Sequence, residues 1–302
     1  MPAFATPEPI FAVVDLVVGD VRIVASDRSD TVVDMRPSDP SRRADATATE
    51  EARVECSAGR LLVKTVRRWR SFSPFSDGGS VDVEIELPTG SRLTADGSMA
   101  TFRCTGSLGD CRIKSGLGDV QVEAAAAVQL TTGAGTVAVE RASGNAELTT
   151  GSGEVRAGAI DGAAVVKNSN GDCYLGEVAG ELRVKAANGD IAIEHAHGSL
   201  TAATANGDIR VGAVSRGSVS AETGFGQVEI AVPDGTAAWL DLSTGYGRLH
   251  NELNAVGPPT PDDDTVEVRA RSGYGDITIR HADPPASIAP IPHDDQNGDS
   301  DA

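Results

Sequence analysis

Glycine recurs at a nearly constant interval through the middle of this chain, and this interval restricts the possible folds more than any other feature of the sequence. The recurring residues are Gly144, Gly153, Gly162, Gly171, Gly180, Gly189, Gly198, Gly207, Gly217 and Gly226, nine residues apart except for one step of ten. Apolar and polar residues alternate between them, as in residues 190–194 (DIAIE). Such alternation is typical of half-buried β-strands, and a fixed period indicates a repeat architecture.

Alternate glycine units differ, so the structural repeat is a pair of units about 18 residues long. One unit of each pair starts with glycine, a polar residue and an apolar residue. Nine such starts occur, at Gly118, Gly135, Gly153, Gly171, Gly189, Gly207, Gly226, Gly247 and Gly275. A single coil cannot bury its apolar edge, whereas stacked coils can. We therefore predict an all-β fold, a single-chain β-solenoid resembling a parallel β-helix, with about 18 residues and two short strands per coil.

Aligning the copies on these glycines produces columns of equivalent residues. Apolar residues such as Val120, Val155 and Ile191 stand two positions after the glycine and are predicted to line the interior. Small polar residues precede the turn and could form hydrogen bonds along the rod; they are Thr132, Thr150, Asn168, Thr204, Thr223, Thr244 and Ser272. The glycine supplies a corner with positive φ, and pairs such as Asn188-Gly189 favour tight turns.

The composition fits a narrow interior, because aromatic residues make up only 4% of the chain and glycine occurs 34 times. With 26 basic and 44 acidic residues the net charge is -18, and this field opposes nucleic acid as a general partner. Cys56, Cys104, Cys111 and Cys173 show neither a C-x-x-C pair nor a neighbouring histidine at metal-ligand spacing. We interpret them as small core residues and expect no metal or cofactor.

The N-terminal residues do not show the pattern of a secretion signal. Residues 1–10 (MPAFATPEPI) contain no Lys or Arg, and the apolar run of residues 11–18 contains Asp15. No uninterrupted apolar stretch reaches the ~18 residues that a membrane-spanning helix needs. We therefore expect a cytoplasmic protein without a transmembrane segment.

The domain organisation predicted from these patterns is a single solenoid over residues 10–281. Residues 1–9 are expected to be a flexible N-terminus and residues 282–302 a disordered acidic tail. Within the solenoid, we expect irregular N-terminal coils over 10–92, regular coils over 93–250, an insertion over 251–264 and a last coil over 265–281. Residues 37–52 are polar and contain proline, which predicts a loop or a short helix.

Residues 81–90 (VDVEIELPTG), followed by repeated (Thr/Asn)-x-x-Gly-Asp-Val coils, carry a family resemblance. In these features the chain resembles the bacterial putative-adhesin family, a β-strand-repeat domain of unknown function common in actinobacteria. The resemblance covers roughly residues 13–281. It implies a β-solenoid and an envelope- or stress-related role in protein interaction, and it supplies no catalytic residues to transfer.

Asn-Gly-Asp triplets one coil apart would place Asp172, Asp190 and Asp208 in a ladder. Calcium-binding solenoids with a nonapeptide period build oxygen cages from glycine-rich turns, but they use a denser Gly-Gly-x-Gly-x-Asp pattern. We interpret these carboxylates as turn-forming residues, with calcium binding as the alternative.

Two groups of residues are candidate contacts for a partner. One is an aromatic column just before the corner glycine, formed by Phe225, Tyr246 and Tyr274. These rings either shield their own corner or stack on a sugar or protein partner. The other is a basic and aromatic segment that includes Arg67, Arg68, Trp69, Arg70, Phe72 and Phe75. Arg and aromatic residues are enriched in interface hot spots, and the alternative is that this segment covers an end of the solenoid.

The histidines are scattered, and the sequence contains neither a nucleophile elbow nor a phosphate-binding loop. We therefore expect a non-enzymatic scaffold or interaction protein with a protein partner. One alternative is a carbohydrate-binding or carbohydrate-active β-helix with a glycan ligand; the other is an exported surface adhesin. The sequence does not indicate an oligomeric state.

Overall fold

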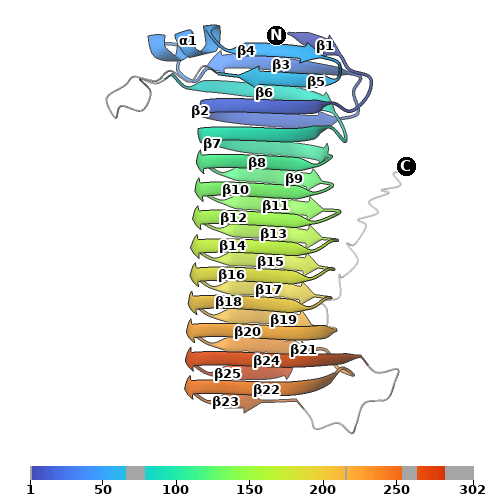
Figure 1. The fold of residues 1–302 in the computed structure, drawn as a ribbon, viewed down its shortest axis with the longest axis vertical. Helices are drawn as coiled ribbons and strands as arrows, with labels where there is room; N and C mark the ends of the chain where they lie inside the picture. The colour runs from blue at the N-terminus through green and yellow to red at the C-terminus, as the bar shows by residue number, and fades with distance from the viewer. Residues whose placement is uncertain (1, 66–78, 215, 254–263, 283–302) are drawn as a thin grey trace, which may run out of the picture.

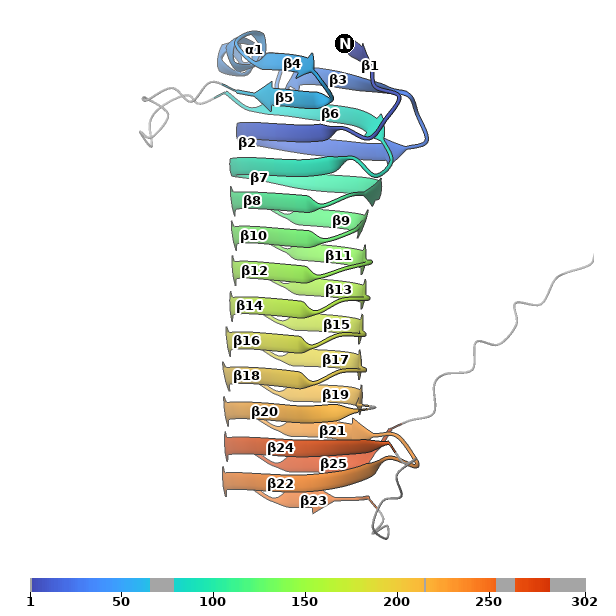
Figure 2. The same ribbon diagram turned by 45° about the vertical axis from the view of Figure 1, so that its right-hand side comes forward.

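The computed structural model describes residues 2–65, 79–214, 216–253 and 264–282, which form a straight rod of stacked β-strands (Figure 1). The strands lie across the rod, and a mostly parallel sheet winds around its axis (Figures 1 and 2). The predicted all-β solenoid is therefore confirmed. Within these described ranges, no helix is both long and apolar enough to cross a membrane.

Each regular coil contains two strands joined at a glycine corner. The first strands are β8 (Cys111–Leu117), β10 (Val128–Ala134), β12 (Ala146–Ser152), β14 (Ala164–Asn170), β16 (Leu182–Asn188), β18 (Leu200–Asn206) and β20 (Gly217–Phe225). The second strands are β9 (Val120–Ala125), β11 (Val137–Ala142), β13 (Val155–Ile160), β15 (Cys173–Val178), β17 (Ile191–Ala196), β19 (Ile209–Val214) and β21 (Val228–Val232). Equivalent strands pair in parallel, as Val137 with Val155 and Val155 with Cys173, which gives the predicted repeat of 18 residues.

The interior is filled by the apolar columns. Leu130, Leu148 and Val166 occupy successive coils at one position and are fully buried, because alternate residues of a strand point to the same side. Cys104, Cys111 and Cys173 are also buried, as predicted for core residues, whereas Cys56 is half-buried.

The small polar column stabilises the corners by bonding to the backbone of the neighbouring coil. The Thr150 hydroxyl donates to the Gly135 carbonyl at 3.0 Å, and the Thr223 hydroxyl donates to the Gly207 carbonyl at 2.9 Å. The predicted hydrogen bonds along the rod therefore join side chain to backbone in these copies. Such bonds satisfy carbonyl groups that would otherwise be buried without a donor.

The N-terminal end is built from one coil enclosed between two others. β2 (Phe11–Ser26) turns at Gly19, whose φ is 142°, and forms a coil with a Gly-Asp corner within the region where irregular coils are predicted. β2 pairs on one side with β7 (Arg92–Leu108) and on the other with β5 (Arg60–Lys64) and β6 (Val81–Pro88). After β2 the chain therefore runs toward the N-terminal end of the rod to form β5 and β6, and then returns to form β7 on the inner side of β2.

Antiparallel strands and one short helix occupy the N-terminal end beyond these coils (Figure 1). They are β1 (Ala3–Ala5), β3 (Asp30–Pro37), β4 (Arg53–Ser57) and α1 (Arg43–Glu50). The segment 37–52, predicted as a loop or short helix, thus contains a helix. Ala3–Ala5 pair with β3, whereas the sequence predicts a flexible segment over residues 1–9. In α1, the buried Asp45 carboxylate accepts the backbone N–H groups of Asp39 and Ser80.

At the C-terminal end, the stacking order of the coils differs from their order in the sequence. The strands are β22 (Ala237–Tyr246), β23 (Leu249–Asn251), β24 (Thr265–Tyr274) and β25 (Ile277–His281). β24 pairs with both β20 and β22, and β25 pairs with both β21 and β23. The coil over 265–281, expected to end the stack, therefore lies inside it, and β22 with β23 forms the outermost coil (Figure 2). Residues 252–264 connect β23 to β24 and provide the length for this return.

Candidate functional site

The aromatic column is the first candidate site, and the structure brings its three rings into one stack. Phe225 ends β20, Tyr274 ends β24 and Tyr246 ends β22, so β-sheet register places all three at one corner of the rod. The ring centroids of Phe225 and Tyr274 are 4.9 Å apart, and those of Tyr274 and Tyr246 are 4.7 Å apart. The interplanar angles are only 3° and 6°. The stacking order is therefore Phe225, Tyr274, Tyr246, because the last two coils are exchanged.

These rings remain accessible to solvent although they stack on one another. Phe225 is 57% exposed, Tyr274 49% and Tyr246 70%. Stacking of neighbouring rings contributes about 0.5–1.5 kcal/mol per pair beyond buried area. The rings thus stabilise their corner and also form an exposed apolar surface, and stacking of a partner on that surface stays a prediction.

A ladder of asparagine side chains continues the same corner toward the N-terminus. Asn206 lies beside Phe225 in the sheet, followed by Asn188 and Asn170. The Asn206 Nδ2 group donates to Asn188 Oδ1 at 2.8 Å, and Asn188 Nδ2 donates to Asn170 Oδ1 at 3.0 Å. We call these three amides together with the three rings the corner ridge; all six side chains are exposed. The ridge has polar donors and acceptors over one half and aromatic rings over the other.

The orientation of the rings determines which ligands they can bind. Both faces of Tyr274 are covered by its neighbours, so this ring presents its edge to solvent. Only the face of Tyr246 that points away from Tyr274 is available for stacking at the outer end. A flat platform for several sugar rings is therefore not formed here, whereas ring edges with positive character suit carbonyl groups and other rings of a protein surface.

The second predicted contact, Arg67, Arg68, Trp69, Arg70, Phe72 and Phe75, lies outside the described residues. Whether these side chains cover the end of the rod or contact a partner stays a prediction.

The aspartate ladder has a structural role at the second position of each corner. Asp172 Oδ1 accepts the backbone N–H of Asp190 at 2.9 Å, and Asp190 Oδ1 accepts that of Asp208 at 2.8 Å. Asp208 in turn accepts the N–H of Gln227 at 2.8 Å. One oxygen of each carboxylate is therefore used to join successive coils. Among the described residues, no group of three His, Cys, Asp or Glu side chains is placed to hold a metal ion.

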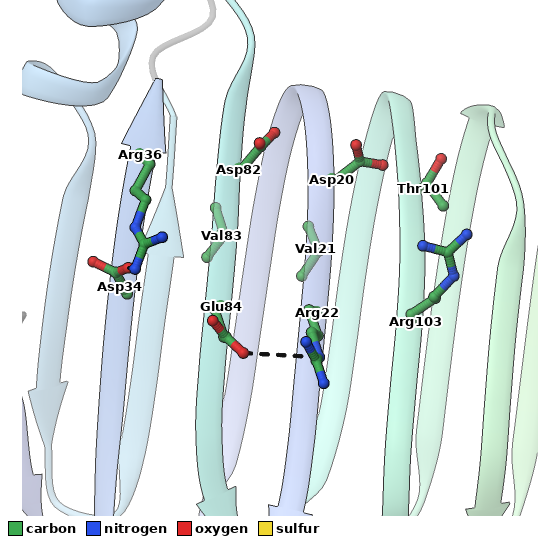
Figure 3. Close-up of a pocket in the computed structure, with 10 residues that line it drawn as sticks. All are labelled: Asp20, Val21, Arg22, Asp34, Arg36, Asp82, Val83, Glu84, Thr101 and Arg103. Atoms are coloured by element: carbon green, nitrogen blue, oxygen red, sulfur yellow. Dashed lines mark ion pairs between the residues drawn. The ribbon is translucent and has the colours of Figure 1, made fainter. Parts of the chain in front are cut away.

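A shallow pocket of about 280 Å³ lies on the outer face of the sheet near the N-terminal end (Figure 3). Neighbouring strands β3, β6, β2 and β7 supply its lining. The charged side chains are Asp20, Asp34, Asp82, Glu84, Arg22, Arg36 and Arg103. The sequence patterns did not single out this pocket, because its members are ordinary outward residues of separate strands that only the N-terminal exchange of coils brings together.

Opposite charges pair across this pocket. Arg22 Nε lies 3.7 Å from Glu84 Oε1, and Arg36 lies 2.5 Å from Asp34 Oδ2. The Arg103 Nε group donates to Gln121 Oε1 at 3.4 Å. Exposed pairs of this kind contribute about 0–1 kcal/mol each. The arrangement is that of a solvated charged face formed by the outward polar residues of amphipathic strands.

Two exposed apolar residues of the outermost coil were not predicted as contacts. Trp239 in β22 is 59% exposed and Leu249 in β23 is 50% exposed. Trp239 pairs in register with Glu267, a polar outward residue, whereas Leu249 pairs with the buried Ile277 and is exposed because its coil is the outermost one. The signal in the sequence was the tryptophan itself, which is one of two in the chain.

Comparisons with known proteins give a family and several distant structural neighbours. The family described as Toastrack DUF4097 matches residues 13–283. A putative adhesin from Parabacteroides distasonis ATCC 8503 is 14% identical, with 92% of this chain and 95% of that chain covered and a TM-score of 0.45. A putative adhesin from Parabacteroides merdae ATCC 43184 is 15% identical, with 76% and 94% covered and a TM-score of 0.45. No curated protein matches the chain. The family match confirms the predicted resemblance to an adhesin-like domain.

Proposed function

This chain belongs to the Toastrack family, and from that premise we propose that it is a non-enzymatic interaction module that binds another protein through the corner ridge. The observation that carries the proposal is the exposed stack of Phe225, Tyr274 and Tyr246. Contiguous exposed aromatic residues on a soluble protein mark interaction surfaces, and aromatic anchors dominate the energetics of such interfaces.

A protein partner fits this surface better than a glycan. The stacked rings offer edges along the rod and a single free face at Tyr246, whereas a saccharide chain would need several free faces. The adjoining amides of Asn206, Asn188 and Asn170 are suited to hydrogen bonds with a polypeptide backbone. The chain's net charge of -18 favours a partner with a basic surface.

The non-enzymatic part of the proposal is supported by what the described polar groups do. The aspartates of the corners accept backbone N–H groups, and in the pocket of Figure 3 Arg22 pairs with Glu84 and Arg36 with Asp34. The cytoplasm remains the proposed compartment, supported by the thiols of Cys104, Cys111 and Cys173, which are buried as core residues rather than joined in disulfides. Cell fractionation of the native host tests this compartment against an exported form.

The test is capture of the native partner by the full chain, its identification by mass spectrometry, and measurement of binding between the two purified proteins. The variant is Phe225→Ser with Tyr246→Ser and Tyr274→Ser, and the matched control is Tyr174→Ser. Tyr174 lies in β15, the second strand of its coil, and is 43% exposed, so its loss removes an exposed ring that is not part of the ridge. The proposal expects binding to fall at least about tenfold in the triple variant and to be unchanged in the control.

Equal binding by the triple variant, at an unchanged melting temperature, would refute the ridge as the contact. Binding to a glycan array that depends on the same rings, or cleavage of a polysaccharide, would instead support the carbohydrate alternative.

A further inference from the structure

In the part of the chain that the structure describes, no strand pairs with the outer edge of the outermost coil, and the sequence of this coil is also unusual. Within the described residues, β22 pairs only with β24 and β23 pairs only with β25. Their outer edges therefore present backbone N–H and C=O groups to the end of the rod. Exposed edges in soluble proteins are normally protected by Lys, Pro, a bulge or a covering element. β22 has the sequence AAWLDLSTGY, with Asp241 as its single charged residue and neither Lys nor Pro.

The core is also incompletely covered at this edge. Leu240 and Leu242 of β22 are half-buried, whereas their register partners in β24, Val268 and Ala270, are fully buried. At the opposite end, antiparallel strands and α1 lie over the outermost coil (Figure 1). One more strand on β22 would bury these leucines and occupy the backbone groups, as each inner coil does for its neighbour.

The inner neighbour of β22 shows which residues such a strand needs. β24 lies parallel to β22 with Arg269 opposite Asp241, at 3.2 Å between Nε and Oδ2, and with Tyr274 stacked on Tyr246. Because the sheet is parallel and its coils are equivalent, the outer edge of β22 has the same register requirements as the inner edge. The outer face of Tyr246 is free to take a ring, and the outer side of Asp241 is free to take a cation.

Charge separates the available occupants of this edge. The described part of the outermost coil, residues 234–253, carries Asp234, Asp241 and Glu252 against Arg248. In a second copy meeting end to end, these carboxylates would face their equivalents, in chains that each carry a net charge of -18. The chain's own residues 283–302 contain five Asp and neither Lys nor Arg. A basic strand from another protein is therefore favoured over both.

We propose that the partner binds by adding a parallel β-strand to the outer edge of β22, with an aromatic residue on Tyr246 and a basic residue beside Asp241. This inference rests on the proposed function and specifies its mode of binding. Main-chain hydrogen bonds supply affinity in such strand addition, and alternate side chains supply specificity. Tyr246 is the last ring of the corner ridge, and the aromatic residue of the incoming strand would extend the stack by one ring.

The test uses the full chain and a peptide with the sequence of β24, TVEVRARSGY, which has the required pattern in the required register. Binding is followed by fluorescence polarisation, and hydrogen exchange locates the peptide. We expect slower exchange confined to residues 237–246 and 249–251. Replacing the peptide's tyrosine by Ser is expected to weaken binding about three- to tenfold. Replacing its first arginine by Glu is expected to weaken binding about fivefold.

A scrambled peptide of the same composition is the control for charge alone. Equal binding by the scrambled peptide, or absence of protection in residues 237–246, overturns strand addition. Concentration-dependent dimerisation of the protein alone that Tyr246→Ser abolishes also overturns it, because a second copy would then occupy the edge.

The same measurements separate this inference from the proposed function. Suppose that Phe225→Ser abolishes binding of the native partner, and that residues 237–246 of the unsubstituted chain still exchange at their free rate in the complex. The ridge is then the contact, and strand addition is refuted. If the partner protects residues 237–246 and binds Phe225→Ser normally, strand addition holds and the ridge proposal fails.

Discussion

Asn168 and Ala186 form an exception in the polar column that makes the stability of the corners measurable. In neighbouring coils a threonine hydroxyl donates to the corner carbonyl one coil below, as Thr150 does to Gly135. Ala186 has no hydroxyl to offer the corresponding Gly171 carbonyl. Asn168 compensates, because its Nδ2 group donates both to Gly153 O at 3.0 Å and to Gly171 O at 2.7 Å. Its Oδ1 atom is buried without a hydrogen-bond donor.

Positions 168 and 186 are therefore expected to be energetically coupled. Asn168→Thr keeps the bond to Gly153 but leaves the Gly171 carbonyl without a side-chain donor, which costs about 1–3 kcal/mol. The same change removes the unpaired Oδ1 atom, which returns a similar amount, so the single variant is expected to be near neutral. Ala186→Thr alone supplies a second donor to a carbonyl already bonded, and is expected to add about 0.5 kcal/mol or less.

In the double variant, the new hydroxyl at position 186 satisfies a carbonyl that is otherwise unpaired. Ala186→Thr should therefore stabilise the Asn168→Thr variant by about 1–2 kcal/mol more than it stabilises the native chain. Urea denaturation of the four proteins measures this difference, provided that their m-values agree. A coupling energy below about 0.3 kcal/mol, or of opposite sign, would refute the explanation of Asn168 as a double donor.

Substitutions at a corner glycine, a core cysteine and a corner aspartate, together with a calcium titration, test the corners and the core. Gly189→Val should lower the free energy of unfolding by about 3 kcal/mol or more, because φ is 133° and a Cβ would lie 2.2 Å from the Gly171 carbonyl oxygen; a thermal melt equal to that of the surface variant Thr201→Val would contradict the corner. Burial raises the pKa of Cys173 from 9.0 to about 11. Because the folded state holds the thiol neutral, the contribution of this thiol to the free energy of unfolding is fully present below pH 9. It is lost as pH rises to 11, a total of about 3 kcal/mol. Cys173→Val should lose this part of the pH dependence, and identical alkaline denaturation curves would count against it. Asp190→Ala should destabilise by about 1 kcal/mol, since it leaves the Asp208 N–H unpaired; calcium titration calorimetry of the native chain should give no heat, and a saturable signal would restore the calcium alternative.

The regular part of the fold could be predicted from the sequence because each coil repeats one local pattern. Two-residue alternation defines the inward residues, and the glycine period defines where the chain turns. Val155, Cys173 and Ile191 accordingly lie in register as predicted. For the polar column, the sequence predicts that the hydrogen bonds run along the rod but does not identify their acceptors. The pattern alone does not distinguish a side chain of the neighbouring coil from a backbone carbonyl of that coil.

The order of the coils at both ends could not be predicted. The equivalence of the coils makes the middle predictable, and the same equivalence leaves the order at the ends undetermined. Coils with equivalent columns can stack on one another in more than one order, so the pattern does not select a neighbour when the connection is long. Residues 252–264 allow β24 to return between β20 and β22. At the N-terminal end, β6 lies outside β2, and residues 89–91 take the chain from β6 to β7 on the inner side of β2. The aromatic column was therefore predicted correctly in its members, whereas the coil over 265–281, predicted to be the last, lies between the other two aromatic coils.

The stacking order Phe225, Tyr274, Tyr246 underlies both the proposed contact surface and the free edge of β22, so its direct test is paired-cysteine crosslinking. Residues on adjacent strands lie within reach of a disulfide, whereas residues two strands apart, at ~9.6 Å, do not. The structure predicts that Phe225→Cys with Tyr274→Cys forms a disulfide in the folded protein and that Phe225→Cys with Tyr246→Cys does not, as read by mass spectrometry of the proteolysed chain. The opposite result would place the coils in sequence order, with Tyr274 at the end of the rod, and would contradict the account.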